Sequence, residues 1–144
     1  VPDRELATAG MRAVLPPSVA HADAVHNVGR TALVVSGFAT GDLSLLAAMY
    51  EDRLHEPYRA EAYPELPRLV GAARQAGALG AALSGAGSSV IALCSDSGDA
   101  RQVALALQSA ARELGLAGRV LSPAIAAAGS KSSDGPRTAT APAS

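Results

Sequence analysis

The segment from Gly77 to Leu93 contains four glycines among apolar runs and is the first candidate for a ligand-binding loop. Glycine lets the backbone enter left-handed turns, and it lets a ligand approach main-chain N–H groups closely. The segment lacks the Gly-Lys-Ser/Thr ending of a Walker phosphate loop, and its spacing is not the Gly-x-Gly-x-x-Gly dinucleotide fingerprint. Two interpretations stay open: a ligand-binding loop, or a tight β-hairpin, which also favours glycine.

A second segment, Asp52 to Arg59, crowds charged and aromatic residues around a proline. An arginine there can present its planar fork to a carboxylate or phosphate, which a lysine meets only as a point charge. The alternative is a solvated helix end at which Arg53 and Arg59 pair with Asp52 and Glu56, and such pairs contribute little at a surface. The residues alone favour this alternative.

A third segment, Thr8 to Pro16, places Thr8 and Arg12 four positions apart and therefore on one face of a helix. A hydroxyl and a guanidinium together suit the carboxylate of an amino acid. The alternative is an N-cap threonine followed by an exposed arginine, which is favoured when the segment is considered in isolation.

We expect the histidines and the cysteine to have structural rather than catalytic roles. The histidines, His21, His26 and His55, lack the paired spacing of a zinc site, so no metal is assigned to them. His26 and Asn27 are expected to make internal hydrogen bonds. The single cysteine, Cys94, excludes an internal disulfide framework and is expected to be a buried thiol in a reducing, cytoplasmic setting.

Composition narrows the class of partner. The chain has 144 residues, 49% of them hydrophobic, with a formal net charge of −1 and scattered basic residues. This pattern argues against binding to nucleic acid or an anionic membrane and favours a small-molecule or protein partner. We find no apolar run of about 18 residues and no export signal. The chain opens at Val1 in what looks like the middle of a domain, so we expect a fragment.

Five stretches have the apolar spacing and end signals of helices. They are 6–15, a stretch capped by Asp23 that ends before Gly41, a stretch capped by Asp42 that ends before Pro57, a stretch from Pro64 to Gly77, and a stretch that follows 95–99 and ends at Gly115. The stretch beginning at Asp23 is apolar around most of its circumference, so we expect that helix to be central and buried.

Two short apolar runs, Ala78–Leu83 and Val90–Leu93, read as strands of a hairpin joined by 84–89, and Arg119–Ile125 can supply another strand. The expected fold is α+β, with an antiparallel sheet of about three to four strands packed by four to five helices. We place one domain at 1–128. Residues 129–144 are rich in Ser, Thr, Pro, Ala and Gly, so we expect a disordered tail.

Taken together and in this order, the three segments resemble the C-terminal half of the homoserine kinases. These enzymes belong to the superfamily of galactokinase, homoserine kinase, mevalonate kinase and phosphomevalonate kinase (GHMP). The resemblance rests on 8–16, 23–30, 52–59 and 77–93, and it covers about residues 1–127. The glycine segment resembles the third motif of the superfamily, whereas Asp-Arg-Leu-His-Glu-Pro-Tyr-Arg points to homoserine kinase within it.

The resemblance implies an ATP- and Mg²⁺-dependent phosphorylation of the L-homoserine hydroxyl in threonine biosynthesis. It implies that Arg12 and Arg59 bind the substrate carboxylate, with Thr8 near the same site and Gly85 in the loop beside the substrate. The neighbouring loop residues are Ser84, Ala86 and Gly87. Two guanidinium groups can hold one carboxylate in a fixed orientation, and phosphoryl transfer depends mainly on positioning and charge stabilisation. A homodimer stays an option.

The chain departs from the family pattern in two places. Ser88 stands where the family usually has proline, so the turn is expected to differ locally. The ATP-phosphate loop, Pro-x-x-x-Gly-Leu-Gly-Ser-Ser-Ala, belongs to an N-terminal domain and does not occur here, so we expect the chain alone to be inactive. Another GHMP kinase of the mevalonate type and a stand-alone ligand-binding regulatory module stay open as alternatives.

Overall fold

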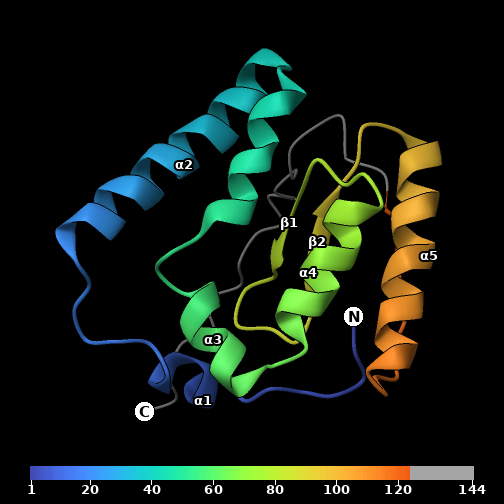
Figure 1. Cartoon of the computed structure of the whole chain (residues 1–144), viewed down its shortest axis with the longest axis horizontal. Helices are drawn as coiled ribbons and strands as arrows, with labels where there is room; N and C mark the ends of the chain where they lie inside the picture. The colour runs from blue at the N-terminus through green and yellow to red at the C-terminus, as the bar shows by residue number, and fades with distance from the viewer. Residues whose placement is uncertain (124–144) are drawn as a thin grey trace, which may run out of the picture.

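The computed structural model describes residues 1–123, which form helices on both sides of a short hairpin (Figure 1). In chain order the elements are α1 (Thr8–Ala13), α2 (His21–Thr40), the 3₁₀ helix η1 (Leu43–Glu51), α3 (Glu56–Ala62), α4 (Leu66–Gln75), β1 (Gly80–Leu83), β2 (Val90–Leu93) and α5 (Ser97–Glu113). The α+β class is confirmed. No helix in this part of the chain is both long and apolar enough to cross a membrane.

The predicted hairpin is confirmed, and β1 pairs with β2 in antiparallel register, with Gly80 opposite Leu93 and Leu83 opposite Val90. The sheet of the described residues has two strands, fewer than the three to four expected. Near the start of the chain, Pro2 and Gly118 form a single bridge. Proline has no N–H to donate to a ladder, which helps to keep this pairing short. The predicted strand 119–125 is not formed over 119–123, and its end lies outside the described residues.

Helices α4 and α5 cover one face of the hairpin, as Figure 1 shows. The buried side chains are mostly small or aliphatic, as expected for a chain so rich in alanine. They form two adjoining clusters: Met11, Tyr63, Leu66, Leu69, Leu83 and Ala110 in one, and Ala73, Ala78, Ala81 and Val103 in the other. The first cluster joins α1 to the hairpin.

The expectation that α2 is central and buried was wrong. Helix α2 packs lengthwise against η1, and Figure 1 shows the pair on the far side of the sheet from α5. Gly37 is its only buried residue, and a Cβ there would lie 3.1 Å from the Asp42 carbonyl oxygen. The large apolar residues lie elsewhere on the helix, and Val28 is 70% exposed. The apolar pattern identified a helix but not what covers it.

Helix ends also differ from expectation. Helix α2 begins at His21 rather than after Asp23, whose carboxylate instead meets Arg53 at 3.3 Å. Asp42 caps the next helix as predicted, accepting a hydrogen bond from the Ser44 N–H. That helix is 3₁₀ and ends at Glu51, so α3 is a separate element. The tail predicted at 129–144 lies outside the described residues.

Candidate functional site

The glycine segment forms a tight turn for which each of its glycines has a structural reason. Gly85 and Gly87 adopt positive φ angles of 62° and 92°, which L side chains rarely adopt. Gly77 has a φ of 95° just beyond the end of α4. Gly80 lies so close to η1 that a Cβ would be 2.6 Å from the Leu46 carbonyl oxygen. The hairpin interpretation therefore accounts for the glycines.

Helix α3 contacts the end of β1 and the glycine turn through two side chains one helical turn apart. The Leu83 N–H donates to Glu56 Oε1 at 2.5 Å, and Arg59 Nη1 donates to the Gly85 carbonyl oxygen at 2.5 Å. Burial raises the pKa of Glu56, although the Leu83 hydrogen bond opposes that shift. These contacts fix the beginning of the glycine turn against α3.

Arg59 is the buried cation of this region, with only 9% of its surface exposed. The expectation that it lies on a solvated helix end is therefore wrong. Its Nε atom is buried and has no hydrogen-bond partner among the described residues. A guanidinium has five N–H donors, so Arg59 keeps donor capacity beyond its bond to Gly85. Arg53, by contrast, lies at the surface and pairs with Asp23.

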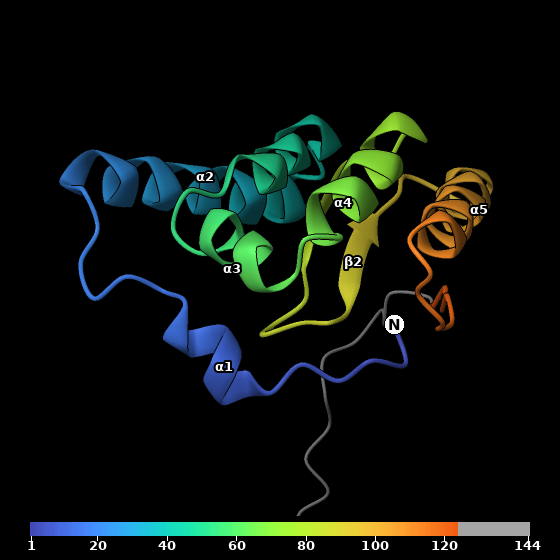
Figure 2. The ribbon, with the colours of Figure 1, turned by 60° about the horizontal axis from the view of Figure 1, so that its bottom comes forward.

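Helix α1 meets the other side of the turn, as Figure 2 shows from below. Met11 is buried in the cluster that contains Leu83, and Ala86 packs against that cluster. Arg12 follows Met11 and is exposed, as is Thr8. Thr8 is the first residue of the helix and not its cap, which is Ala7, so the N-cap interpretation was wrong.

Ser88 fastens the turn to the start of the chain. Its hydroxyl donates to the Arg4 carbonyl oxygen at 2.6 Å, and only 7% of the residue is exposed. A proline at this position has no hydroxyl and would lose the bond. The departure from the family pattern therefore has a local structural role.

The expected internal hydrogen bonds of His26 and Asn27 are confirmed. His26 Nε2 lies 2.9 Å from the Glu51 carbonyl oxygen, and Asn27 Nδ2 donates to Asp52 Oδ1 at 2.5 Å. Within residues 1–123, no three His, Cys, Asp or Glu side chains gather as a metal-binding set. Cys94 is partly buried, and burial raises the pKa of its thiol.

Sequence reasoning missed Asp52 and Glu56 as the groups that place α3. Asp52 accepts from the Leu54, His55 and Glu56 N–H groups at the helix start. An aspartate just before a helix with proline in its first turn is an N-terminal signal that could have identified it. The pairing of Glu56 with Leu83 has no local signal, because the two residues are 27 positions apart.

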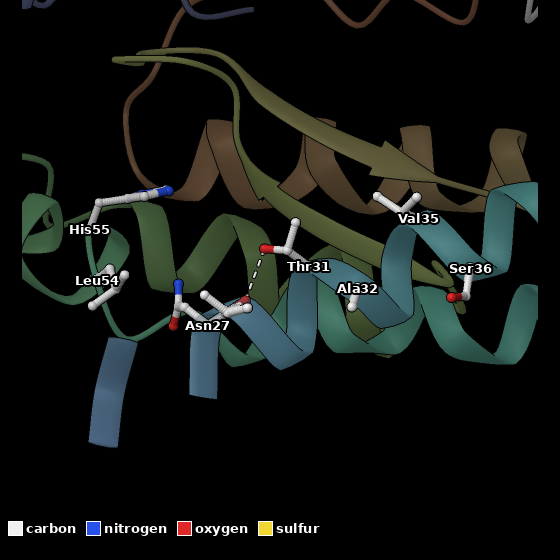
Figure 3. A pocket seen from close by; sticks show the side chains of 8 residues that line it. Asn27, Thr31, Ala32, Val35, Ser36, Leu54 and His55 are labelled. Carbon is white, nitrogen blue, oxygen red and sulfur yellow. Dashed lines mark hydrogen bonds between the residues drawn. The ribbon is translucent and has the colours of Figure 1, made fainter. Parts of the chain in front are cut away.

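An open groove of about 720 Å³ lies beside α2, as Figure 3 shows. Val28, Thr31 and Val35 line it from α2, and Leu54 and His55 line its end near Asn27. The Thr31 hydroxyl donates to the Asn27 carbonyl oxygen within the helix, so it is already satisfied. None of the residues predicted for substrate binding lines this groove.

Comparisons with known proteins identify a family and relatives of known name that are similar to this chain. Residues 34–113 match the family model described as GHMP kinases C terminal. A homoserine kinase of Caldicellulosiruptor saccharolyticus is 45% identical over 111 residues, which are 76% of this chain and 36% of that protein. A homoserine kinase of Deinococcus radiodurans is 40% identical over 129 residues, covering 90% of this chain and 42% of that protein.

The fold has a solved counterpart. The crystal structure of a homoserine kinase from Cytophaga hutchinsonii superposes with a TM-score of 0.76 at 30% sequence identity, covering 81% of this chain and 37% of that one. The chain thus spans between about a third and two fifths of the length of these similar proteins.

Proposed function

The chain belongs to the family of GHMP kinase C-terminal domains, and from this premise we propose that it forms the substrate-binding part of an ATP-dependent homoserine kinase. The reaction transfers the γ-phosphoryl group of ATP to the side-chain hydroxyl of L-homoserine and yields O-phospho-L-homoserine. We assign it to threonine biosynthesis in the cytoplasm. The observation that carries the proposal is Arg59, a buried guanidinium with spare donors beside the glycine turn.

Arg59 and Arg12 are proposed to hold the substrate carboxylate. Arg59 is fixed from within the fold, because one N–H is bound by Gly85. Arg12 is exposed on α1, which packs against the same turn through Met11. Thr8 and Gly85 lie beside the substrate in this proposal, with Ser84, Ala86 and Gly87 forming the loop. Charge-assisted bonds to a planar guanidinium fix both the position and the orientation of a carboxylate.

The described residues of this chain provide no site suited to ATP or Mg²⁺, which the reaction also requires. The glycine turn has neither the lysine nor the Ser/Thr ending of a phosphate loop, and the described residues offer no cluster of metal-binding side chains. We therefore derive no step through ATP or Mg²⁺ and assign their binding mainly to another part of the enzyme. What this chain supplies is a fixed carboxylate site that orients the hydroxyl.

Steady-state kinetics of the protein encoded by the complete gene test this assignment. We expect Arg59→Ala and Arg12→Ala each to raise the KM for L-homoserine about 10- to 100-fold, because each removes a charge-assisted hydrogen bond. Arg68→Ala is the matched control, since Arg68 is exposed and pairs at 2.7 Å with Glu113 of α5 rather than with the glycine turn. Unchanged KM values in both test variants would refute the carboxylate-binding roles.

A substrate analogue separates carboxylate binding from general damage. L-Homoserinol keeps the amine and the reacting hydroxyl but replaces the carboxylate with an alcohol. The wild-type enzyme should strongly prefer L-homoserine, whereas Arg59→Ala should lose most of that preference. A preference retained in the variant would contradict the proposal. We expect the 144-residue chain alone to show no turnover of L-homoserine.

A further inference from the structure

The position of Arg59 depends on how α3 is held, and the start of α3 is anchored by one carboxylate. Asp52 Oδ1 accepts from Asn27 Nδ2 at 2.5 Å and from the Leu54 N–H at 3.2 Å. Asp52 Oδ2 accepts from the His55 N–H at 2.9 Å and from the Glu56 N–H at 2.5 Å. Both oxygens are therefore occupied by two donors each.

Electrostatics agree with this geometry. Burial alone would raise the pKa of Asp52, but the hydrogen bonds from Glu56, Asn27, His55 and Leu54 outweigh burial and lower it. The carboxylate is therefore favoured in its charged form, which also complements the positive end of the α3 backbone dipole.

Asn27 connects this cap to a different element. Its side-chain amide donates to Asp52 and accepts from the Arg53 N–H at 2.9 Å, so both polar atoms of the amide bind consecutive residues of one segment. A rotation of the amide would break both bonds together. Close by, Arg30 Nε meets Glu51 Oε2 at 3.1 Å, which ties a neighbouring turn of α2 to the same segment.

The aspartates that cap the other helices lack this connection. Asp96 accepts only from the Gly98 and Asp99 N–H groups of its own helix. Asp42 accepts from the Ser44 N–H and hydroxyl in the same way. Asp52 alone among these three caps is also bonded to a side chain of another helix, 25 positions away.

From these contacts we infer that Asn27 and Asp52 are positioning residues, which lock the start of α3 to α2 and thereby set the Arg59 guanidinium against the glycine turn. The path runs from Asn27 through Asp52 to the first turn of α3, and one turn later to Arg59 and Gly85. The catalytic consequence rests on the proposed role of Arg59 in binding the substrate. The structural consequence does not depend on that role.

Two variants distinguish the bond between Asn27 and Asp52 from the capping of α3 by Asp52. Asn27→Ala removes the two amide bonds from α2 to Asp52 and Arg53 but leaves Asp52 with its three backbone donors. Asp52→Asn weakens both the connection to Asn27 and the cap. Thr31→Val is the matched control for Asn27 on the same face of α2, because its hydroxyl bonds only within the helix. Asp42→Asn is the matched control for Asp52, because it alters a cap that has no contact with α3.

The first measurement is the ¹H–¹⁵N spectrum of the labelled protein encoded by the complete gene. We expect the Gly85 amide and Arg59 Nε–H signals to shift in Asn27→Ala and Asp52→Asn and to stay in place in both controls. If the signals of both test variants coincide with those of the wild type, the inference is overturned. If Asp52→Asn unfolds the chain, Asn27→Ala still decides the question.

The second measurement is the kinetics of the complete gene product. A displaced Arg59 should raise the KM for L-homoserine about tenfold in Asn27→Ala, since misplacement of about 1 Å can cost up to about a hundredfold. The KM for ATP should change by less than twofold. An equal loss in both KM values, or none in the KM for L-homoserine, would overturn the positioning role. If homoserine is not a substrate but the NMR signals shift, the proposed function fails and the structural inference stands.

Discussion

Replacing Gly80 with alanine tests the packing of η1 against β1, the contact that holds the α2–η1 pair to the sheet. A Cβ at Gly80 would lie 2.6 Å from the Leu46 carbonyl oxygen and 2.7 Å from Met49 Sδ. The methionine can rotate away, but the backbone carbonyl cannot. The first distance is about 0.8 Å below the 3.4 Å at which ordinary contact begins, so strand and helix must separate.

Overpacking of this kind destabilises a fold by about 1 to 3 kcal/mol. For a domain of this size, each kcal/mol lowers the Tm by about 3 to 5 °C, so we expect a fall of about 3 to 15 °C. Circular dichroism during thermal and urea unfolding measures it. The control is Gly71→Ala in α4, where a Cβ has open space and the expected effect is a gain of about 0.5 to 1 kcal/mol. A Gly80→Ala variant as stable as the wild type would refute the packing.

Three further substitutions test the region around the glycine turn. Tyr63→Phe should raise the free energy of unfolding by about 1 kcal/mol, because the fully buried Tyr63 hydroxyl has no partner among the described residues; a lower Tm would contradict this. Leu83→Ala should cost about 2 to 5 kcal/mol in urea unfolding, since Leu83 is only 5% exposed; a loss below about 1 kcal/mol would show that the cluster is loose. Glu56 has a raised pKa in the folded state, so its contribution to stability is present below its ordinary pKa and declines as the pH rises through the folded value. Glu56→Gln should therefore gain stability relative to the wild type as the pH rises from the ordinary pKa of a glutamate through the folded value, and a difference that is constant with pH would contradict the raised pKa.

Some features that follow from local sequence were predicted correctly, although the N-caps considered at Thr8 and Asp23 were wrong because both of these residues lie inside their helices. The hairpin is encoded by two apolar runs around a glycine turn, and the positive φ angles of Gly85 and Gly87 explain why glycine stands there. The predicted cap at Asp42 is local as well, because its side chain accepts from the N–H group two residues away. Such contacts leave a signal in the order of residues.

The features that depend on distant parts of the chain were missed. Arg59 resembles a surface residue of a charged helix end, and its burial becomes visible only once Gly85 is brought to it from 26 positions away. The apolar character of α2 predicted a helix, yet it could not say that η1 covers only the side around Gly37 and leaves Val28 exposed. Periodicity reveals which residues are apolar, whereas burial depends on the neighbour that covers them.

The most direct test of the central claim is the substrate range of the protein encoded by the complete gene, measured as ATP-dependent phosphorylation of L-homoserine and of mevalonate in parallel. Our account predicts formation of O-phospho-L-homoserine, with little or no product from mevalonate, because the similar proteins that cover most of this chain are homoserine kinases. Phosphorylation of mevalonate without phosphorylation of homoserine would contradict the account.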